Sequence, residues 1–188
     1  MTGLVRATDL IGRPVVTLSG ENVARIKDVV FAAPGGRILG FTLAARGAFG
    51  GRLHQALPWS RVRGAGNDAV MIDDGVLPDR DDLVARAEIH DGEVLGDLVL
   101  TDAGTSLGTV TDVIVEFGTE PQVAGYEIRT GDALPPAGRT VLIPRADTMA
   151  ASGEAVIVPS AVTEHVADDL AGLGATITSI RTSPGGRR

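Results

Sequence analysis

The apolar residues of this chain occur in short runs separated by clusters of turn-forming residues. In the first eighty positions the runs recur at roughly ten-residue spacing, which is typical of short β-strands in a sandwich or barrel. The segment Leu53–Leu57 alternates, with Leu53, Gln55 and Leu57 on one face. The other runs are 15–18, 23–31, 38–45 and 69–72.

The same pattern is repeated later in the chain. Asp9–Gly12 (DLIG) matches Glu93–Gly96 (EVLG), 84 positions on. The offset grows only to 86 over the following sixty or so residues, so the two copies stay in register. A period of this size is the length of a small domain and is too long for a solenoid unit. The further matched pairs are Ile26–Val30 with Val110–Ile114, Gly40–Leu43 with Gly125–Ile128, Leu57–Pro58 with Ile143–Pro144, and Ala69–Ile72 with Ala155–Val158.

The strands and the repeat together predict an all-β fold of two tandem small antiparallel β-barrels. Closing each sheet into a barrel would remove the unpaired edges that so small a sheet otherwise exposes. The charged segment 78–82 is the expected joint. We therefore expect a first copy at 1–82, a diverged second copy at 83–182, and a disordered tail at 183–188.

One amphipathic helix is expected near the C-terminus, over Thr163–Leu173. Val162, Val166, Leu170 and Leu173 recur with helical spacing and form one face. The following residues, 175–180, alternate and predict a final strand.

Composition places the chain among soluble proteins without covalent crosslinks. It has no cysteine among its 188 residues, which excludes disulfides, thiol nucleophiles and iron–sulfur clusters. Neither a secretory signal nor a run of about 18 uncharged apolar residues is present. We expect a cytoplasmic protein with no transmembrane segment.

The net charge of −7 is unevenly distributed along the chain. Residues 1–63 hold nine basic and three acidic residues, whereas residues 64–188 hold eight basic and 21 acidic ones. Either surface charge drifts along the chain, or the first half presents a cationic face that steers anionic partners.

No catalytic or metal-binding constellation can be recognised. His54, His90 and His165 lack the i, i+4 spacing of metal ligands, and no serine lies in a nucleophile elbow. Asp28 and Asp112 occupy matching positions in the two copies, so each is expected to serve its own copy structurally. We expect no enzyme activity, no metal and no cofactor.

The best candidate contact surface is the glycine-rich segment 47–51 with the arginines around it. The glycines permit backbone conformations with open N–H groups, and arginine binds carboxylate or phosphate. The alternative is a mobile hairpin with a solvated arginine rim. The candidate binding residues are Arg46, Phe49, Arg52, Trp59, Arg61 and Arg63.

These residues resemble the PRC-barrel family. The first copy carries the family's Leu-Ile-Gly opening at 10–12, its Ile-x-Asp-Val strand at 26–29 and its Leu-Pro-Trp at 57–59. The second copy has Arg145 where the first has Trp59, and it lacks the glycine-rich hairpin. The resemblance implies small antiparallel barrels that dock onto other molecules, as in the photosynthetic reaction-centre H subunit and a ribosome maturation factor.

We therefore expect a cytoplasmic, non-catalytic adaptor or assembly module that binds another protein through the first barrel. The alternative is an RNA- or ribosome-associated maturation factor. The overall acidity argues against nucleic acid, which prefers a basic patch with interleaved aromatic residues. The sequence does not identify the protein partner or the oligomeric state.

Overall fold

A computed structural model describes residues 3–32, 36–46, 51–84, 94–145, 150–151 and 154–182. The described residues divide into two compact units. The first-repeat unit contains 7–84 and 119–122. The second-repeat unit contains 3–6, 94–118 and 123–182. Each unit is described by itself below.

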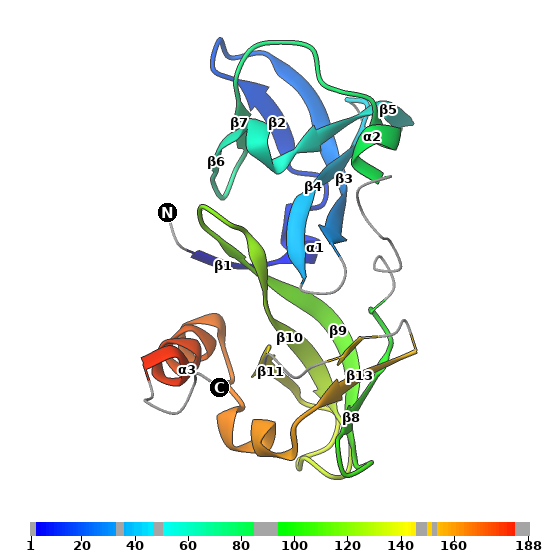
Figure 1. The fold of residues 1–188 in the computed structure, drawn as a ribbon, viewed down its shortest axis with the longest axis vertical. Helices are drawn as coiled ribbons and strands as arrows, with labels where there is room; N and C mark the ends of the chain where they lie inside the picture. The colour runs from blue at the N-terminus through cyan, green and yellow to red at the C-terminus, as the bar shows by residue number, and fades with distance from the viewer. Residues whose placement is uncertain are drawn as a thin grey trace. The chain divides into compact units, whose positions relative to one another are not determined.

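The first-repeat unit is a set of short strands joined by tight turns (Figure 1). Successive strands β2 to β5 pair antiparallel, β7 lies parallel to β2, and β6 pairs with β7. One-turn helices begin and end the unit. Its elements are α1 (Ala7–Leu10), β2 (Pro14–Thr17), β3 (Asn22–Ala32), β4 (Arg37–Ala44), β5 (Arg52–Pro58), η1 (Trp59–Arg61), β6 (Val62–Ala65), β7 (Val70–Ile72) and α2 (Arg80–Val84).

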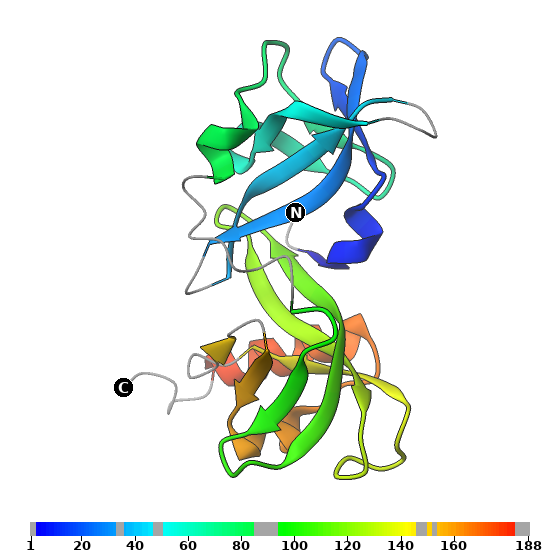
Figure 2. The same ribbon diagram turned by 90° about the vertical axis from the view of Figure 1, so that its right-hand side faces the viewer.

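The second-repeat unit repeats this arrangement (Figure 2). β13 lies parallel to β8, as β7 does to β2, and β8 pairs antiparallel with β9. β11 pairs antiparallel with β10, and β12 with β13. Its elements are β1 (Gly3–Arg6), β8 (Leu98–Thr101), β9 (Ser106–Phe117), β10 (Gln122–Thr130), β11 (Thr140–Pro144), β12 (Ala150–Ala151), β13 (Ala155–Val158), η2 (Ser160–His165) and α3 (Leu170–Thr182).

The backbone hydrogen bonds of the two units match at the offsets predicted from the sequence. Gly12 N donates to Ile26 O, and Gly96 N donates to Val110 O, both at 2.8 Å. Gly12 and Gly96 both have positive φ, 81° and 91°, as the turn before β2 and β8 requires. The repeat is therefore structural as well as sequential.

The prediction of a mainly β fold with a C-terminal helix is confirmed. Most of the strand pairs are antiparallel, as predicted, and each unit also contains one parallel pair, β2 with β7 and β8 with β13. Within the described residues, the strand pairing of neither unit closes on itself.

The C-terminal helix differs from the predicted one. Residues 160–165 form the short 3-10 helix η2, and α3 begins only at Leu170, after Asp169. The Asp169 side chain accepts a hydrogen bond from Gly172 N at 2.7 Å and so caps the helix. The prediction of a strand at 175–180 is wrong: Leu173 and Ile177 are buried one helical turn apart, and alternation over so few residues does not distinguish the two periods.

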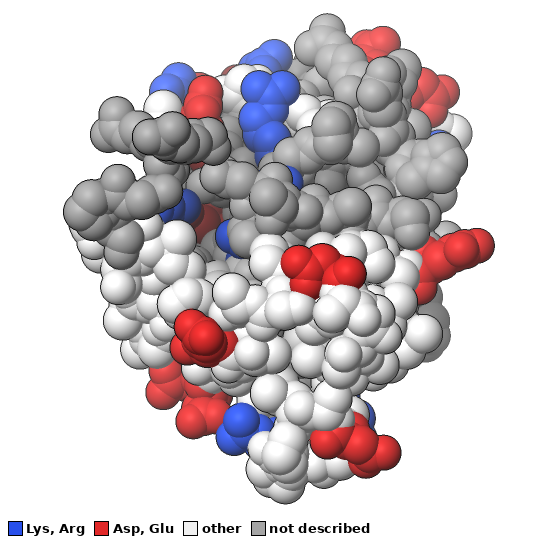
Figure 3. Space-filling view, turned by 60° about the horizontal axis from the view of Figure 1, so that its bottom comes forward, with Lys and Arg blue, Asp and Glu red and all other residues white. Residues whose placement is uncertain are grey.

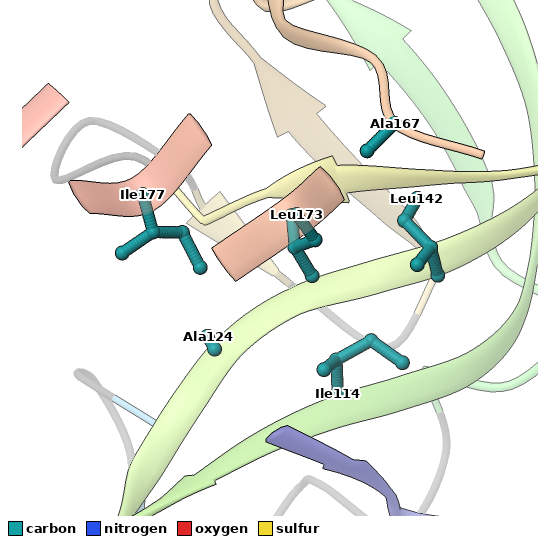
Figure 4. Close-up of a cluster of buried hydrophobic side chains, with 6 residues drawn as sticks. All are labelled: Ile114, Ala124, Leu142, Ala167, Leu173 and Ile177. Atoms are coloured by element: carbon teal, nitrogen blue, oxygen red, sulfur yellow. The ribbon is translucent and has the colours of Figure 1, made fainter. Parts of the chain in front are cut away.

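Each unit covers the same part of its sheet with the helix that follows its last strand. In the first-repeat unit, Leu83 of α2 packs with Val30 and Ala56. In the second-repeat unit, Leu173 and Ile177 of α3 point toward the strands (Figure 4). The strand residues that they meet are Ile114, Ala124 and Leu142, the repeat equivalents of Val30, Leu39 and Ala56.

Strand β1 joins the second-repeat unit although it lies in the first copy of the repeat in the sequence. Gly3 pairs with Phe117 and Arg6 pairs with Ile114. The structural division therefore differs from the boundary expected at residue 82, because β1 gains a strand edge on β9, a buried contact for Leu4 and an ion pair of Arg6 with Glu127 of β10. The tail at 183–188 lies outside the described residues.

Candidate functional site

Trp59 has a packing role in the first-repeat unit. It opens η1 directly after β5, where Pro58 fixes an extended backbone. Its ring lies 6.2 Å from that of Phe41, with an angle of 57° between the planes. Such tilted aromatic pairs are stabilising. The half-buried indole therefore contributes to the core as well as to the surface.

Arg63 is occupied by an acidic partner on the neighbouring strand end. Its Nε donates to Asp73 Oδ2 at 2.7 Å, across the β6–β7 hairpin. This hydrogen bond is the largest cause of a lowered pKa of Asp73, with smaller contributions from the charges of Arg63 and Arg61. Arg61 is exposed and, within the described part of the chain, has no ion pair of its own.

Replacing Arg63 with Gln should raise the pKa of Asp73 toward its ordinary value. The folded-state pKa of Asp73 lies below its unfolded value, so the pair contributes stability above the unfolded pKa and loses it as pH falls through the folded pKa. The pair is exposed, so its effect on stability is small. A carbon-detected NMR titration of the Asp73 carboxyl measures the shift. Arg61→Gln is the control and should move the pKa less; equal pKa values in wild type and Arg63→Gln would contradict the assignment.

Two further predicted binding residues, Arg46 and Arg52, follow β4 and begin β5, respectively. Arg46 is exposed just beyond the end of β4, and the backbone of Arg52 pairs with Ala44 at the start of β5. Phe49 and the side chain of Arg52 lie outside the described residues. The structure therefore brings Arg61 and Arg63 together, whereas Arg46 belongs to a separate hairpin.

Two exposed aliphatic residues that sequence reasoning missed lie in the turn after β2 and in the segment after β7. Val76 is 88% exposed and Leu18 is 61% exposed. The segment carrying Val76 is tied to the β2–β3 turn by the Ser19 hydroxyl, which donates to Asp74 Oδ1. A Cβ at Gly75 would lie 3.8 Å from Arg61 Nη1. We call Leu18, Arg61, Arg63 and Val76 the first-repeat surface. The signal in the sequence was an isolated aliphatic residue in each of two polar turns.

In the second-repeat unit, the aliphatic residue of the equivalent region is buried. The Ser160 side chain and backbone N–H donate to Asp102, which lowers the pKa of that carboxyl. Val162, the repeat equivalent of Val76, is only 4% exposed, because η2 packs against β11. The repeats thus share a serine–aspartate hydrogen bond here but differ in whether an aliphatic side chain is left exposed.

The two structural units do not differ in charge in the way that the two halves of the sequence do. The described residues of the first-repeat unit include nine basic and ten acidic residues, since the acids on either side of β7 and those of α2 belong to the same unit. Those of the second-repeat unit include five basic and ten acidic side chains. In the view of Figure 3, Asp and Glu outnumber Lys and Arg on the described surface in front. The first-repeat unit is nearly neutral, and the second is acidic.

The structure assigns Asp28 and Asp112 to separate units. The Thr42 hydroxyl donates to Asp28 Oδ2 at 2.9 Å, and Val113 N donates to the buried Asp112 at 2.7 Å. Within the described ranges, no group of three or more His, Asp and Glu side chains is placed to share a metal ion.

A family model for the PRC-barrel domain matches the chain twice, over residues 3–76 and 87–162. The two matches cover most of the chain and coincide with the two copies of the repeat. The chain belongs to the PRC-barrel domain family and contains two such domains in tandem. No curated protein matches it. Among the described residues, no helix combines the length and apolar character needed to cross a bilayer.

Proposed function

We propose that this tandem PRC-barrel protein is a non-catalytic adaptor that binds another protein through the first-repeat surface. The observation that supports it is the exposure of Val76 and Leu18 in two segments joined by the Ser19–Asp74 hydrogen bond, with Arg61 close to Gly75. Aliphatic side chains that are exposed singly need no explanation, but two of them in hydrogen-bonded segments beside arginine resemble the anchors of protein interfaces.

The chemistry of the surface suits a protein partner. Val76 and Leu18 can be removed from water by an apolar side chain of the partner, which would contribute roughly 1.5–3 kcal/mol for each side chain fully buried. Arg61 can bind a carboxylate of the partner in a bidentate fashion. Arg63 is held by Asp73 and would help to fix the orientation of the partner.

The comparison between the repeats favours the first one as the binding element. The second-repeat unit buries Val162 with its own η2 and covers its sheet with the 13-residue α3. The first-repeat unit leaves Val76 exposed and has only the five-residue α2. The second repeat would then support the first.

The proposal includes two finer features: each repeat forms a PRC-type barrel, and the protein acts in the cytoplasm. RNA or ribosome binding has less support, because the acidic residues of the first-repeat unit offset its arginines.

Affinity capture with the full chain as bait tests the proposal. The variant Val76→Asp with Arg61→Glu should lose the proteins that wild type captures, since it replaces an apolar anchor and reverses a charge. The matched control is Leu95→Asp with Arg129→Glu, which changes an exposed aliphatic residue and an exposed arginine of the second-repeat unit. Capture that is unchanged by the first variant, or lost equally with the control, would contradict the assignment. Ribonuclease-sensitive, salt-dependent capture would favour RNA instead.

A further inference from the structure

Strand β1 belongs to one repeat by sequence and to the other by structure. The first PRC-barrel match begins at residue 3 and therefore includes β1. In the structure, β1 pairs antiparallel with the end of β9, in the second-repeat unit. The register places Leu4 opposite Glu116 and Val5 opposite Val115. The second-repeat unit thus completes its sheet with a strand taken from outside its own repeat.

Leu4 anchors β1 beneath α3. It packs against the buried cluster formed by strand residues and by Leu173 and Ile177 of the helix. Gly174 of the same helix lies beside Leu4, because a Cβ at that position would be 3.6 Å from Leu4 Cδ1, in ordinary van der Waals contact. In the view of Figure 4, the blue ribbon of β1 runs along β9 below the helix. The contact is an apolar subsite for one aliphatic side chain.

Arg6 supplies a second, charged anchor two residues later. Its Nε donates to Glu127 Oε2 at 2.6 Å, and the Thr111 hydroxyl donates to Glu127 Oε1 at 3.1 Å. The Glu127 side chain is only 14% exposed. A carboxylate so shielded requires a partner, and a charge-assisted hydrogen bond in that setting is specific for a cation.

Helix α3, which packs over Leu4, also makes an ion pair with β9. Both Arg181 guanidinium Nη atoms donate to Glu116, at 3.1 and 2.7 Å. The bidentate pair joins the last turn of α3 to the residue opposite Leu4. The Arg181–Glu116 pair thus holds α3 against β9 through residues that do not belong to β1.

We propose that the edge of β9, with the Leu4 subsite under α3 and the Glu127 carboxylate, is a peptide-binding site. It takes an extended segment with an aliphatic residue followed two positions later by arginine, and β1 occupies it as a ligand attached to the same chain. The binding mode is strand addition, in which main-chain hydrogen bonds provide affinity and alternate side chains provide specificity. The site is separate from the first-repeat surface, so it does not depend on the proposed function.

Because β1 is covalently attached to the protein, an external peptide must compete with it for the site. A ligand attached to the same chain competes at an effective concentration that is set by the chain connecting it to the site. The wild-type chain should therefore bind little added peptide. Substitutions that weaken the binding of β1 without altering the site should make the site available to an added peptide.

The test uses a fluorescent peptide with the sequence of residues 1–8, MTGLVRAT, and two forms of the protein. One is the full chain with Leu4→Asp and Arg6→Glu, and the other is the chain lacking residues 1–6. Both should bind the peptide about 10- to 100-fold more tightly than wild type does, as expected for a site with a charge-assisted anchor. Where either form is unfolded alone, the peptide should restore its fold, as measured by circular dichroism and hydrogen exchange at residues 114–117.

Charge reversal gives the specificity control. When Glu127→Lys is added to either of these two forms, the protein should no longer bind the peptide MTGLVRAT. A peptide carrying Arg6→Glu should bind this charge-reversed protein instead. A peptide carrying Leu4→Asp should bind neither protein. The proposal is overturned if neither of the two forms, the Leu4→Asp/Arg6→Glu chain or the chain lacking residues 1–6, binds the peptide or refolds with it. It is also overturned if Glu127→Lys leaves the preference between the two peptides unchanged.

Discussion

Replacing Gly40 or Gly125 with Ala should unfold the corresponding unit at a markedly lower temperature than wild type. A Cβ at Gly40 would lie 2.2 Å from Leu57 O, and one at Gly125 would lie 2.3 Å from Ile143 O. Both obstacles are backbone atoms of the neighbouring strand, beside Pro58 and Pro144, so no side-chain rotation relieves them. We expect a loss of about 3 kcal/mol or more for each variant.

The measurement is thermal and urea unfolding, in which such a loss corresponds to roughly 6–12 °C for a protein of this size. Gly64→Ala and Gly118→Ala are the controls, because a Cβ at either position meets nothing within 4 Å. They should leave the melting temperature almost unchanged. A stable Gly40→Ala protein would mean that β4 and β5 are farther apart than the structure places them.

Leu173→Ala should destabilise the second-repeat unit by about 2–5 kcal/mol, the range for removing a buried leucine side chain. Leu173 is 0% exposed and packs against strand residues including Ile114 and Leu142. Its loss leaves a cavity between α3 and the sheet. The same change weakens the cover over Leu4, so amide exchange at residues 114–117 should accelerate as well.

Ile180→Ala on the same helix is the matched control, because Ile180 is among the exposed large hydrophobic residues. It should change stability by no more than about 0.5 kcal/mol. Equal effects of the two substitutions on the unfolding free energy would argue against the packing described for α3.

The repeat could be predicted because each copy uses the same residues for the same backbone tasks. Gly20 and Gly104 both have positive φ and both donate to the carbonyl of a threonine three residues earlier. Such turn requirements are local, and they are visible in the sequence as glycines at a constant offset. The strands at 22–32 and 37–44 were predicted within a residue or two for the same reason.

What could not be predicted depends on contacts between distant residues. The ion pair of Arg63 with Asp73 joins residues that fall in different halves of the charge count, so the count overstated the positive character of the first repeat. The exposure of Val76 follows from the absence of a helix like η2 around it, although Val76 and Val162 are equivalent in sequence. For Arg46, Phe49 and Arg52 the binding role stays a prediction.

The place of β1 has a consequence for how the chain is made. Ribosomes add roughly 5–20 residues per second, so Leu4 and Val5 are synthesised roughly 5–20 seconds before their partners around Val115 exist. The first-repeat unit can fold during that interval without β1, since its own strands are complete by Ile72. The second unit cannot complete its sheet until the earliest residues of the chain return to it. Vectorial synthesis therefore makes the pairing of β1 with β9 a late step, one that follows the synthesis of everything between them.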